Sequence, residues 1–164
     1  MIDIIPAKNQ KDYLMIERLA DIIWREHYIS IISLEQIEYM LEKYNSVKAI
    51  TQKAHQGTLF YYMNYQNTPA GYFAIEIKPD YLYVSKLYVL SEYRGNKIAK
   101  KTMLFAESMA KEQGKKSIKL HVNKYNANSI SAYKKMGFVN SESVVTDIGC
   151  GFIMDDYLMI KQLD

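Results

Sequence analysis

The fold of this chain is decided by residues 86–99, which read KLYVLSEYRGNKIA. The aromatic and β-branched residues at 81–90 predict a long strand, because such side chains fit a pleated, half-buried surface. After the turn at 91–96, apolar residues recur at steps of three and four until Gly114, which is the pattern of one helix face ended by a glycine. The stretch therefore predicts a strand, a tight turn and a helix in succession.

A second buried strand is predicted directly after this helix, at 117–122. A helix between two strands of one sheet usually makes a right-handed crossover, which leaves the two strands parallel. Two earlier strands, at 58–65 and 70–77, flank turn-like residues at 67–69 and indicate an antiparallel hairpin. We therefore expect a mixed sheet with its parallel pair in the middle, and ligands at the carboxyl ends of those strands.

Helices are predicted both before and after these strands in the sequence. Ile16, Leu19 and Ile23 recur at helical spacing in a first helix, and Ser33 followed by Gln36 forms a capping box for a second. Beyond the strand at 117–122, we predict a short helix and two final strands, at 126–136, 138–146 and 152–160. The fold class is therefore α/β (α+β), with a central mixed, mostly antiparallel sheet flanked by about four helices.

Size and composition favour an ordinary globular protein. The 164 residues are 49% hydrophobic and 24% charged, so we expect one domain spanning residues 1–164. A net charge of +3 is small for a dedicated nucleic-acid binder. Cys150 is the only cysteine, which excludes a disulfide framework and suits a reducing compartment. Because the start carries no basic leader and no apolar run approaches about 18 residues, we expect a cytoplasmic protein and no membrane partner.

The turn at 91–96 has the chemistry of an anion site. The first amides of a helix have no partner within the helix, and the helix dipole favours negative charge beside them. Gly95 lets a phosphate approach the main chain closely, while Arg94, Lys97, Lys100 and Lys101 place cations nearby. A pyrophosphate would fit here; the alternative is an ordinary basic helix start with solvated lysines.

This turn resembles motif A of the GNAT superfamily of N-acetyltransferases, which reads Gln or Arg, two residues, Gly, one residue, then Gly or Ala. Arg94 and Ala99 fit that pattern, and Gly95 fits the accessory glycine that is common after the Arg. Lys97 departs from it, because it stands where the family usually has Gly. We expect pyrophosphate binding to persist, with the Lys97 side chain turned outward.

Residues 126–138, NANSISAYKKMGF, resemble motif B of the same superfamily. That motif reads Asn, two residues, Ala or Ser, three residues, Tyr, three residues, then Gly-Phe, and every fixed position matches. The order of the two motifs and the strand-sized gap between them make the combined resemblance specific over residues 81–138. It implies the GNAT fold with a splayed parallel pair, acetyl-coenzyme A as cofactor and no metal.

The resemblance implies a set of cofactor-binding residues. The main chain at Leu87 to Val89 would bind the pantetheine arm, although plain core packing of these side chains is equally consistent with the sequence. Asn126 would bond the pantetheine or cap its helix. The whole expected cofactor set is Leu87, Tyr88, Val89, Arg94, Gly95, Asn96, Lys97, Ile98, Ala99, Lys100, Asn126, Ser129 and Tyr133.

Tyr133 is the expected catalytic acid, because the matching tyrosine of the family lies near the thiol and a phenol can donate a proton to a departing thiolate. A tyrosine packed beside Phe138 is the structural alternative. The base stays open between Glu76, His121 and the pair Asp155 and Asp156, which stand on opposite faces of one strand. A metal site is not favoured, since the three histidines, His27, His55 and His121, show no ligand spacing.

The sequence indicates the acceptor substrate less specifically than the cofactor. We expect direct attack of a primary amine on acetyl-coenzyme A in a ternary complex, with a small molecule such as a polyamine as acceptor, because the first two helices carry Glu26, Glu35 and Glu38. The alternatives are a noncatalytic acetyl-coenzyme A sensor and an acetyltransferase acting on a protein or a charged transfer RNA. A nucleic-acid partner is not favoured, and the final hairpin around Cys150 could pair with a second copy as a homodimer.

Overall fold

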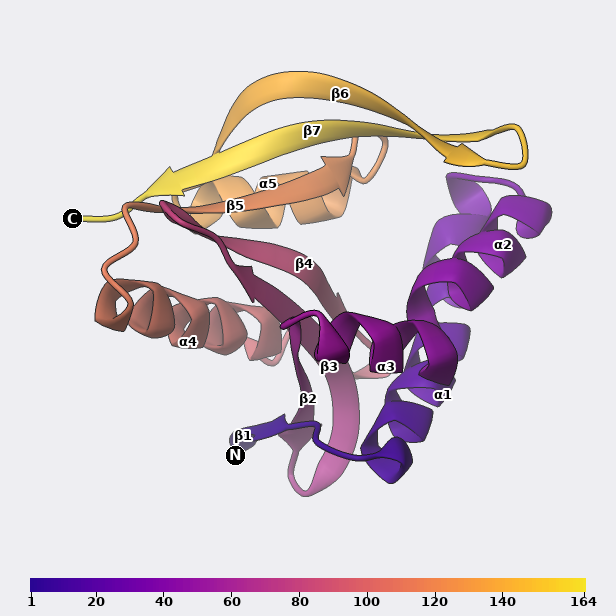
Figure 1. Cartoon of the computed structure of the whole chain (residues 1–164), viewed down its shortest axis with the longest axis horizontal. Coiled ribbons are helices and arrows are strands. Elements are labelled where there is room, and N and C mark those ends of the chain that lie inside the picture. Colours follow the sequence, from indigo (N-terminus) through magenta and orange to yellow (C-terminus); the bar gives the residue numbers. More distant parts are fainter. The chain divides into compact units, whose positions relative to one another are not determined.

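A computed structural model describes the whole chain, residues 1–164 (Figure 1). The α-helices are α1 (Gln10–His27), α2 (Leu34–Asn45), α3 (Val47–His55), α4 (Ile98–Glu112) and α5 (Ala127–Lys135), with short 3₁₀ helices η1 (Tyr28–Ser30) and η2 (Ser91–Tyr93). The strands are β1 (Ile2–Pro6), β2 (Leu59–Tyr65), β3 (Thr68–Ile77), β4 (Tyr81–Val89), β5 (Ser117–Asn123), β6 (Val139–Gly149) and β7 (Phe152–Gln162).

The seven strands hydrogen-bond in the order β1-β2-β3-β4-β5-β7-β6. The sheet is mostly antiparallel, and β4 and β5 form its parallel pair, as the crossover predicted. The parallel register runs from Tyr81 opposite Ser117 to Val84 opposite Leu120, and pairing between the two strands ends there. The strands thus part after Val84, which is the splayed pair that the resemblance implies.

The chain divides into two compact units that are not continuous in sequence. The first unit comprises residues 1–76 and 86–105, and the second comprises residues 77–85 and 106–164. Strand β4 and helix α4 are each divided between the units. Residues 81–85 of β4 and 106–112 of α4 belong to the second unit, and the remainder of each element belongs to the first.

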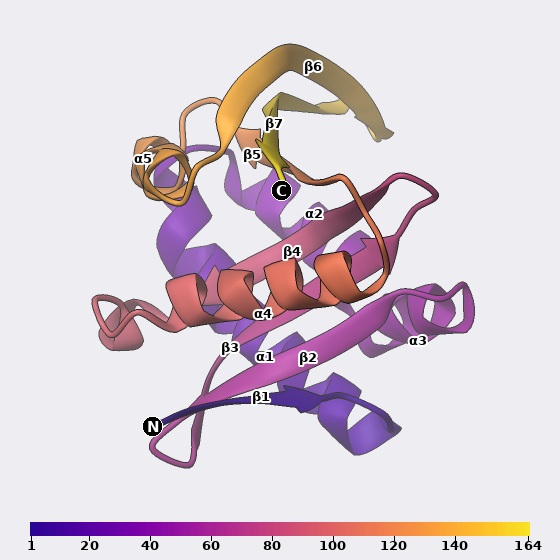
Figure 2. The same cartoon turned by 90° about the vertical axis from the view of Figure 1, so that its left-hand side faces the viewer.

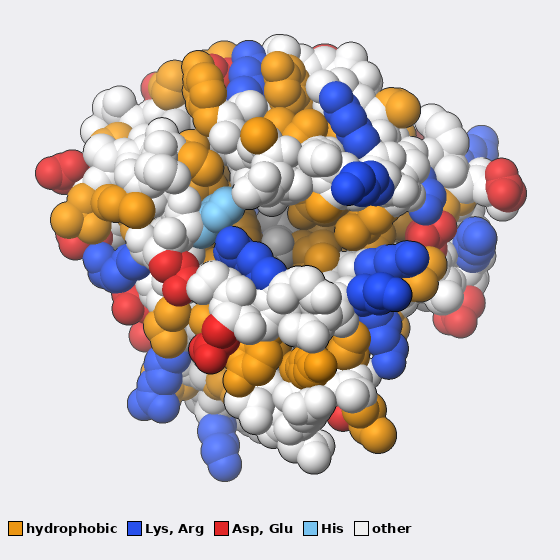
Figure 3. Space-filling view, turned by 180° about the vertical axis from the view of Figure 1, so that it is seen from behind, with side chains coloured by type: hydrophobic (Ala, Val, Ile, Leu, Met, Phe, Trp, Pro, Cys, Tyr) orange, Lys and Arg blue, Asp and Glu red, His pale blue; other side chains and the backbone are white.

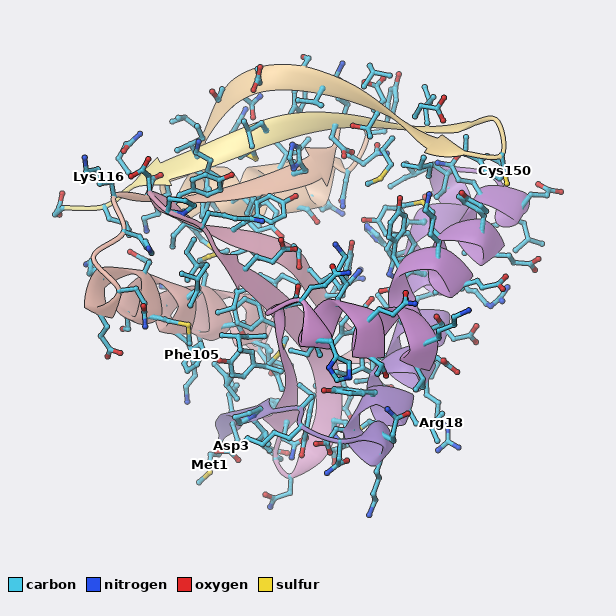
Figure 4. The ribbon with its side chains drawn as sticks, in the orientation of Figure 1. Met1, Asp3, Arg18, Phe105, Lys116 and Cys150 are labelled. Carbon is cyan, nitrogen blue, oxygen red and sulfur yellow. The ribbon has the colours of Figure 1, made fainter.

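The first unit contains β1 to β3 and the three N-terminal helices. The strands β1, β2 and β3 lie side by side in Figure 2, and α1, α2 and α3 pack against one another. The ring of Phe105, labelled in Figure 4, lies 5.2 Å from that of Tyr61 and 6.3 Å from that of Phe73. This aromatic group therefore anchors the first turns of α4 on the strands.

A buried polar chain links the helices of the first unit to β3. The Trp24 indole donates a hydrogen bond to the Tyr72 hydroxyl at 2.9 Å, and that hydroxyl donates to the Asn45 side-chain oxygen at 2.9 Å. All three residues are buried, and burial raises the pKa of Tyr72 well above its usual value. The chain satisfies polar groups that would otherwise be costly to bury.

The second unit is built on β5 and the long hairpin of β6 and β7. Ile118, Leu120 and Val122 of β5 are buried, whereas His121 between them is exposed. The alternation shows that one face of this strand is covered and the other is not. Cys150 lies at the tip of the hairpin and is exposed (Figure 4).

Two elements were absent from the sequence prediction. Strand β1 is only five residues long and ends at Pro6, so its pattern is too short to be read. Helix α3 begins one residue after Ser46, whose hydroxyl accepts a hydrogen bond from the Ala49 amide at 3.1 Å. The predicted capping box of α2 is confirmed, since the Ser33 hydroxyl accepts from the Gln36 amide at 3.1 Å.

Candidate cofactor and catalytic sites

The turn between β4 and α4 is held by its own hydrogen bonds. The Tyr93 amide donates to the Leu90 carbonyl at 3.0 Å, and the Asn96 side chain donates to the Tyr93 carbonyl at 2.9 Å. The Lys101 amide donates to the Lys97 carbonyl at 3.0 Å and so begins the helical hydrogen bonding. The amides before it stand at the open end of the helix, where an anion can accept hydrogen bonds from them.

Two residues of this turn have left-handed backbones: Gly95 has a φ of +82° and Lys97 a φ of +64°. Lys97 therefore keeps the conformation that glycine favours at this motif position, at a cost of about 1 kcal/mol for a residue with a side chain. Its side chain is exposed, as expected. No atom lies within 4 Å of a Cβ built on Gly95, so the space beside the main chain is open.

These observations test whether the turn fits a diphosphate. Arg94, Lys97 and Lys100 are exposed around the open amides, and no acidic residue stands between Tyr93 and Lys101. The Arg94 Nε lies 3.4 Å from the Val89 carbonyl, so its side chain folds back beside the end of β4. Cations, amides and open space together fit the pyrophosphate of a coenzyme.

The end of β4 lies unusually close to β3. A Cβ on Gly71 would collide with the Tyr88 carbonyl oxygen and would lie 3.2 Å from the Val89 Cα. The Tyr88 ring packs 5.4 Å from Trp24 and 5.2 Å from Tyr72. Glycine at residue 71 thus fixes the path of the main chain that is expected to bind pantetheine, and the Tyr88 side chain itself belongs to the aromatic packing.

Helix α1 reaches the same turn through a carboxylate. The Glu26 Oε1 accepts a hydrogen bond from the Ser91 amide, the first of η2, at 3.0 Å. Glu26 was expected only as one of the acids that suit a cationic acceptor; this contact gives it a role in holding the turn between β4 and α4. No local pattern could have found it, because 65 residues separate the two partners.

Asn126 and Tyr133 lie at the two ends of α5 in the second unit. Asn126 is buried, and its side-chain oxygen accepts from the Ser129 amide at 3.4 Å, so it caps the helix. The Tyr133 ring packs edge-on against Phe138, with 5.7 Å between ring centroids, and the residue is half-buried. Asn126 therefore has the alternative role of a helix cap, and Tyr133 the alternative role of a ring packed beside Phe138.

His121 is hydrogen-bonded to a residue that the sequence did not single out. Its Nδ1 lies 2.6 Å from the Tyr83 hydroxyl, and the two rings meet edge to face with centroids 5.6 Å apart. Although part of the His121 side chain is exposed, loss of hydration around the ring lowers its pKa, and this outweighs the raising effect of the Glu142 carboxylate. The imidazole is therefore neutral near pH 7 and able to accept a proton.

Glu76 lies half-buried near the end of β3, and its charge acts on Lys86 of β4. The pKa of Lys86 is lowered to about 8, chiefly by burial and then by the Lys53 charge, against a raising effect of Glu76. The Lys86 ammonium lies 5.8 Å from the centre of the Tyr44 ring. Glu76 therefore interacts with a cation of its own unit.

The two neighbouring acids of β7, Asp155 and Asp156, differ from each other in their surroundings. Asp155 forms an ion pair of 2.8 Å with Lys124. Asp156 is buried, and burial followed by the Asp155 charge raises its pKa to about 6, against a lowering by Lys124. Their opposite faces agree with the strand pattern that the sequence predicted.

The expected site residues thus fall into two groups. The first unit brings together Leu87, Tyr88, Val89, Arg94, Gly95, Asn96, Lys97, Ile98, Ala99 and Lys100, and it also contains Glu76. The second unit contains His121, Asn126, Ser129 and Tyr133. No group of His, Cys, Asp and Glu side chains is arranged to hold a metal ion, and none of the helices is long and apolar enough to cross a membrane.

Comparison with known proteins gives consistent matches. Residues 16–138 match the model of a family described as the Acetyltransferase (GNAT) family. A spermidine N(1)-acetyltransferase of Thermoplasma acidophilum is 31% identical over 137 residues, which cover 80% of this chain and 83% of that protein.

Solved structures agree with this match. A PaiA N-acetyltransferase from Thermoplasma acidophilum, solved in complex with coenzyme A, superposes with a TM-score of 0.84 at 25% identity and covers 99% of both chains. A GCN5-related N-acetyltransferase from Rhodopseudomonas palustris has a TM-score of 0.82 at 19% identity, covering 98% of this chain and 95% of that one, and shows the shared fold.

Proposed function

Because the chain belongs to the GNAT acetyltransferase family, we propose that it transfers the acetyl group of acetyl-coenzyme A to a primary amine of a small molecule, with a polyamine as the leading candidate. That it is an acetyl-coenzyme A-dependent N-acetyltransferase follows from the family. The observation that carries the assignment is the open helix start at Arg94 to Ala99, in which Lys97 adopts the glycine-like backbone.

Each part of the cofactor has candidate partners in this chain. The amides of the turn and the cations Arg94, Lys97 and Lys100 would hold the pyrophosphate, since a helix start and nearby cations favour negative charge. The main chain of Leu87 to Val89 would bind the pantetheine arm, and Asn126 and Ser129 would support it from α5. When bound, acetyl-coenzyme A supplies a thioester carbonyl that a neutral amine can attack.

Tyr133 is proposed to donate its hydroxyl proton to the departing sulfur. Its half-buried position at the far end of α5 from Asn126 supports this role, because a phenol in a partly dry site stabilises developing charge better than one in water. Tyr133→Phe should lower kcat by about 100-fold while leaving the KM for acetyl-coenzyme A within twofold. Equal turnover of the two proteins would exclude the acid role, and Tyr125→Phe, an exposed tyrosine, is the control.

The acceptor must lose an ammonium proton before it attacks. Glu76 and His121 are the proposed acceptors of that proton: Glu76 is a half-buried carboxylate and His121 is a neutral imidazole. Glu76→Gln and His121→Asn remove one acceptor each and keep the side-chain shape. The variant whose pH profile of kcat/KM loses its acidic limb identifies the base, and an unchanged profile clears that residue.

A polyamine acceptor is supported by the spermidine acetyltransferase relative and by the exposed Glu35 of α2, whereas the exposed Asp21 and Glu38 pair with Arg25. Figure 3 shows Lys and Arg side chains interspersed with acidic and apolar ones on the face in view, rather than a continuous basic surface for a nucleic acid. We also propose a cytoplasmic location, which suits the exposed free thiol of Cys150.

The deciding experiment measures release of coenzyme A thiol with a panel of amines: spermidine, spermine, putrescine, a peptide with a free amino terminus and a charged transfer RNA. We expect the highest kcat/KM with a polyamine. A preference for the peptide or the transfer RNA would overturn the small-molecule assignment. Tight binding of acetyl-coenzyme A without thiol release for any amine would indicate a sensor instead of an enzyme.

A further inference from the structure

We propose that Tyr83 takes the proton from the acceptor's ammonium group while passing its own hydroxyl proton to His121, which then releases a proton to solvent. The inference rests on the proposed function, because it concerns how the acceptor amine becomes neutral. It adds Tyr83 as the residue that faces the amine, and it chooses His121 over Glu76 as the final proton acceptor.

Tyr83 and His121 both belong to the second unit. Parallel pairing of β4 with β5 ends at Val84 opposite Leu120, so Tyr83 and His121 lie where the two strands separate. His121 stands on the face of β5 opposite the buried Ile118, Leu120 and Val122, and it is exposed there. An amine dissolved in water can therefore approach the pair from this face.

Tyr83 and His121 are joined by a short hydrogen bond. A distance of 2.6 Å between the Tyr83 hydroxyl and the His121 Nδ1 is at the short end for any hydrogen bond to nitrogen. When the hydroxyl donates, Nδ1 is the acceptor and the ring carries its hydrogen on Nε2. In that tautomer the imidazole can accept a further proton only at Nδ1, and Nδ1 is reached through Tyr83.

The surroundings of His121 allow it to receive and release a proton. The register places Leu158 of β7 directly beside it, with Glu142 of β6 beside Leu158. The other titratable or charged groups on this face are Tyr81 and Tyr83 of β4, Lys119 of β5 and Asp156 of β7. The Lys119 ammonium lies over the Tyr81 ring, 4.2 Å from its centre, and so makes a cation–π contact with that ring. The exposure of His121 gives solvent access for the final release.

The proton transfers balance. One N–H bond of the ammonium group breaks as the Tyr83 oxygen gains that proton, and the Tyr83 O–H bond breaks as Nδ1 of His121 gains its proton. The imidazolium then loses the Nε2 hydrogen to water, and the next cycle begins after the ring returns to its first tautomer. The amine is left neutral with a free electron pair, and Tyr83 is a phenol again.

The experiment compares Tyr83→Phe, His121→Asn and Tyr81→Phe. Tyr83→Phe removes only the hydroxyl. His121→Asn keeps an oxygen that can accept from Tyr83 but cannot be protonated near neutral pH. Tyr81→Phe is the matched control, because Tyr81 lies two residues earlier on the same face of β4. Circular dichroism and thermal melting establish that each variant is folded.

Two readouts are needed. The first is kcat/KM for spermidine against pH: the wild type and Tyr81→Phe should share an acidic limb, whereas Tyr83→Phe and His121→Asn should lose it together with about 100-fold in rate. The KM for acetyl-coenzyme A should stay unchanged in all four proteins. The second is the ¹⁵N shift of the His121 ring in the free protein, which should report an acceptor Nδ1 in the wild type and a mixture of tautomers in Tyr83→Phe.

The outcomes separate the relay from the function on which it rests. If Tyr83→Phe retains the acidic limb and the ring tautomer of the wild type, the relay is wrong even if the wild type acetylates spermidine. Loss of the limb in Glu76→Gln alone would also overturn it. If the wild type consumes no acetyl-coenzyme A with any amine, the proposed function fails, whatever the ring tautomer of His121 in the free protein.

Discussion

The Glu26 carboxylate accepts a hydrogen bond from the Ser91 amide at 3.0 Å, and it thereby ties the last turn of α1 to the start of the turn expected to bind the cofactor. A carboxylate placed this way replaces the partner that the amide would otherwise find in water. It also joins helix α1, whose acids are expected to suit a cationic acceptor, to the turn expected to hold the coenzyme.

Replacing Glu26 should therefore weaken cofactor binding. Glu26→Ala should raise the KM for acetyl-coenzyme A about tenfold, because a hydrogen bond to a charged group contributes about 1.5 kcal/mol. Glu26→Gln keeps an oxygen acceptor and should recover most of the loss. Glu38→Ala, which removes an exposed partner of Arg25, is the control. A change confined to the KM for the amine would mean that Glu26 contacts the acceptor instead.

The backbone of Lys97 offers a test of stability. Lys97→Gly should raise the free energy of unfolding by about 0.5–1 kcal/mol, because glycine adopts a φ of +64° without steric cost. Lys97→Val should lower it by a similar amount or more, since a β-branched residue tolerates this conformation least. Urea denaturation measures both. The order Gly, Lys, Val is the prediction, and a glycine variant less stable than the wild type would contradict it.

Gly71 should tolerate no side chain. Gly71→Ala should cost about 1–3 kcal/mol and lower the affinity for acetyl-coenzyme A, because the new methyl group meets the Tyr88 carbonyl and must displace β4. Thermal melting and calorimetric titration with the coenzyme measure the two effects. Gly114→Ala is the comparison: it is strained by a φ of +69° but meets no atom, so it should lose stability and keep the affinity. Unchanged affinity in Gly71→Ala would show that β3 does not position the cofactor strand.

Asp156 should make stability depend on pH. Its folded pKa of about 6 lies above the usual 3.8, so the unfolded chain loses the proton first and stability falls as pH rises between about 4 and 6. Above pH 6 the buried charge should cost about 2–3 kcal/mol, a cost that Asp156→Asn removes. The variant should be more stable than the wild type at pH 7.5 and equal to it at pH 3.5 in chemical denaturation. Asp155→Asn removes the second cause of the raised pKa but leaves Asp156 buried and breaks the ion pair with Lys124, so its gain should be smaller than that of Asp156→Asn.

The sequence predicted what is encoded locally. Arg94 to Ala99 form the strand-to-helix turn, Ser33 caps α2 and Asn126 caps α5, because each of these depends on residues within a few positions of one another. The conformation of Lys97 was the open question, and it proved to follow the glycine pattern.

The residues that the sequence did not reveal depend on register between distant segments. Tyr83 meets His121 across 38 residues, and Glu26 meets Ser91 across 65. The lowered pKa of Lys86 likewise depends first on the burial of its side chain and then on Lys53 of α3, more than 30 residues earlier in the chain. Such pairings follow only when strand order is known, and hydrophobic periodicity does not supply it.

Strand β7 lies between β5 and β6, and it is made after both of the strands that it joins. While the chain is synthesised, β6 emerges with no neighbour to receive its main-chain amides, and β5 keeps one side unpaired. Both strands depend on residues 152–162 for this pairing, so a chain cut short within β7 leaves β6 unpaired and β5 open on one side. Such a fragment would be prone to aggregate and to be degraded, which makes the completion of β7 the step on which safe folding of this unit depends.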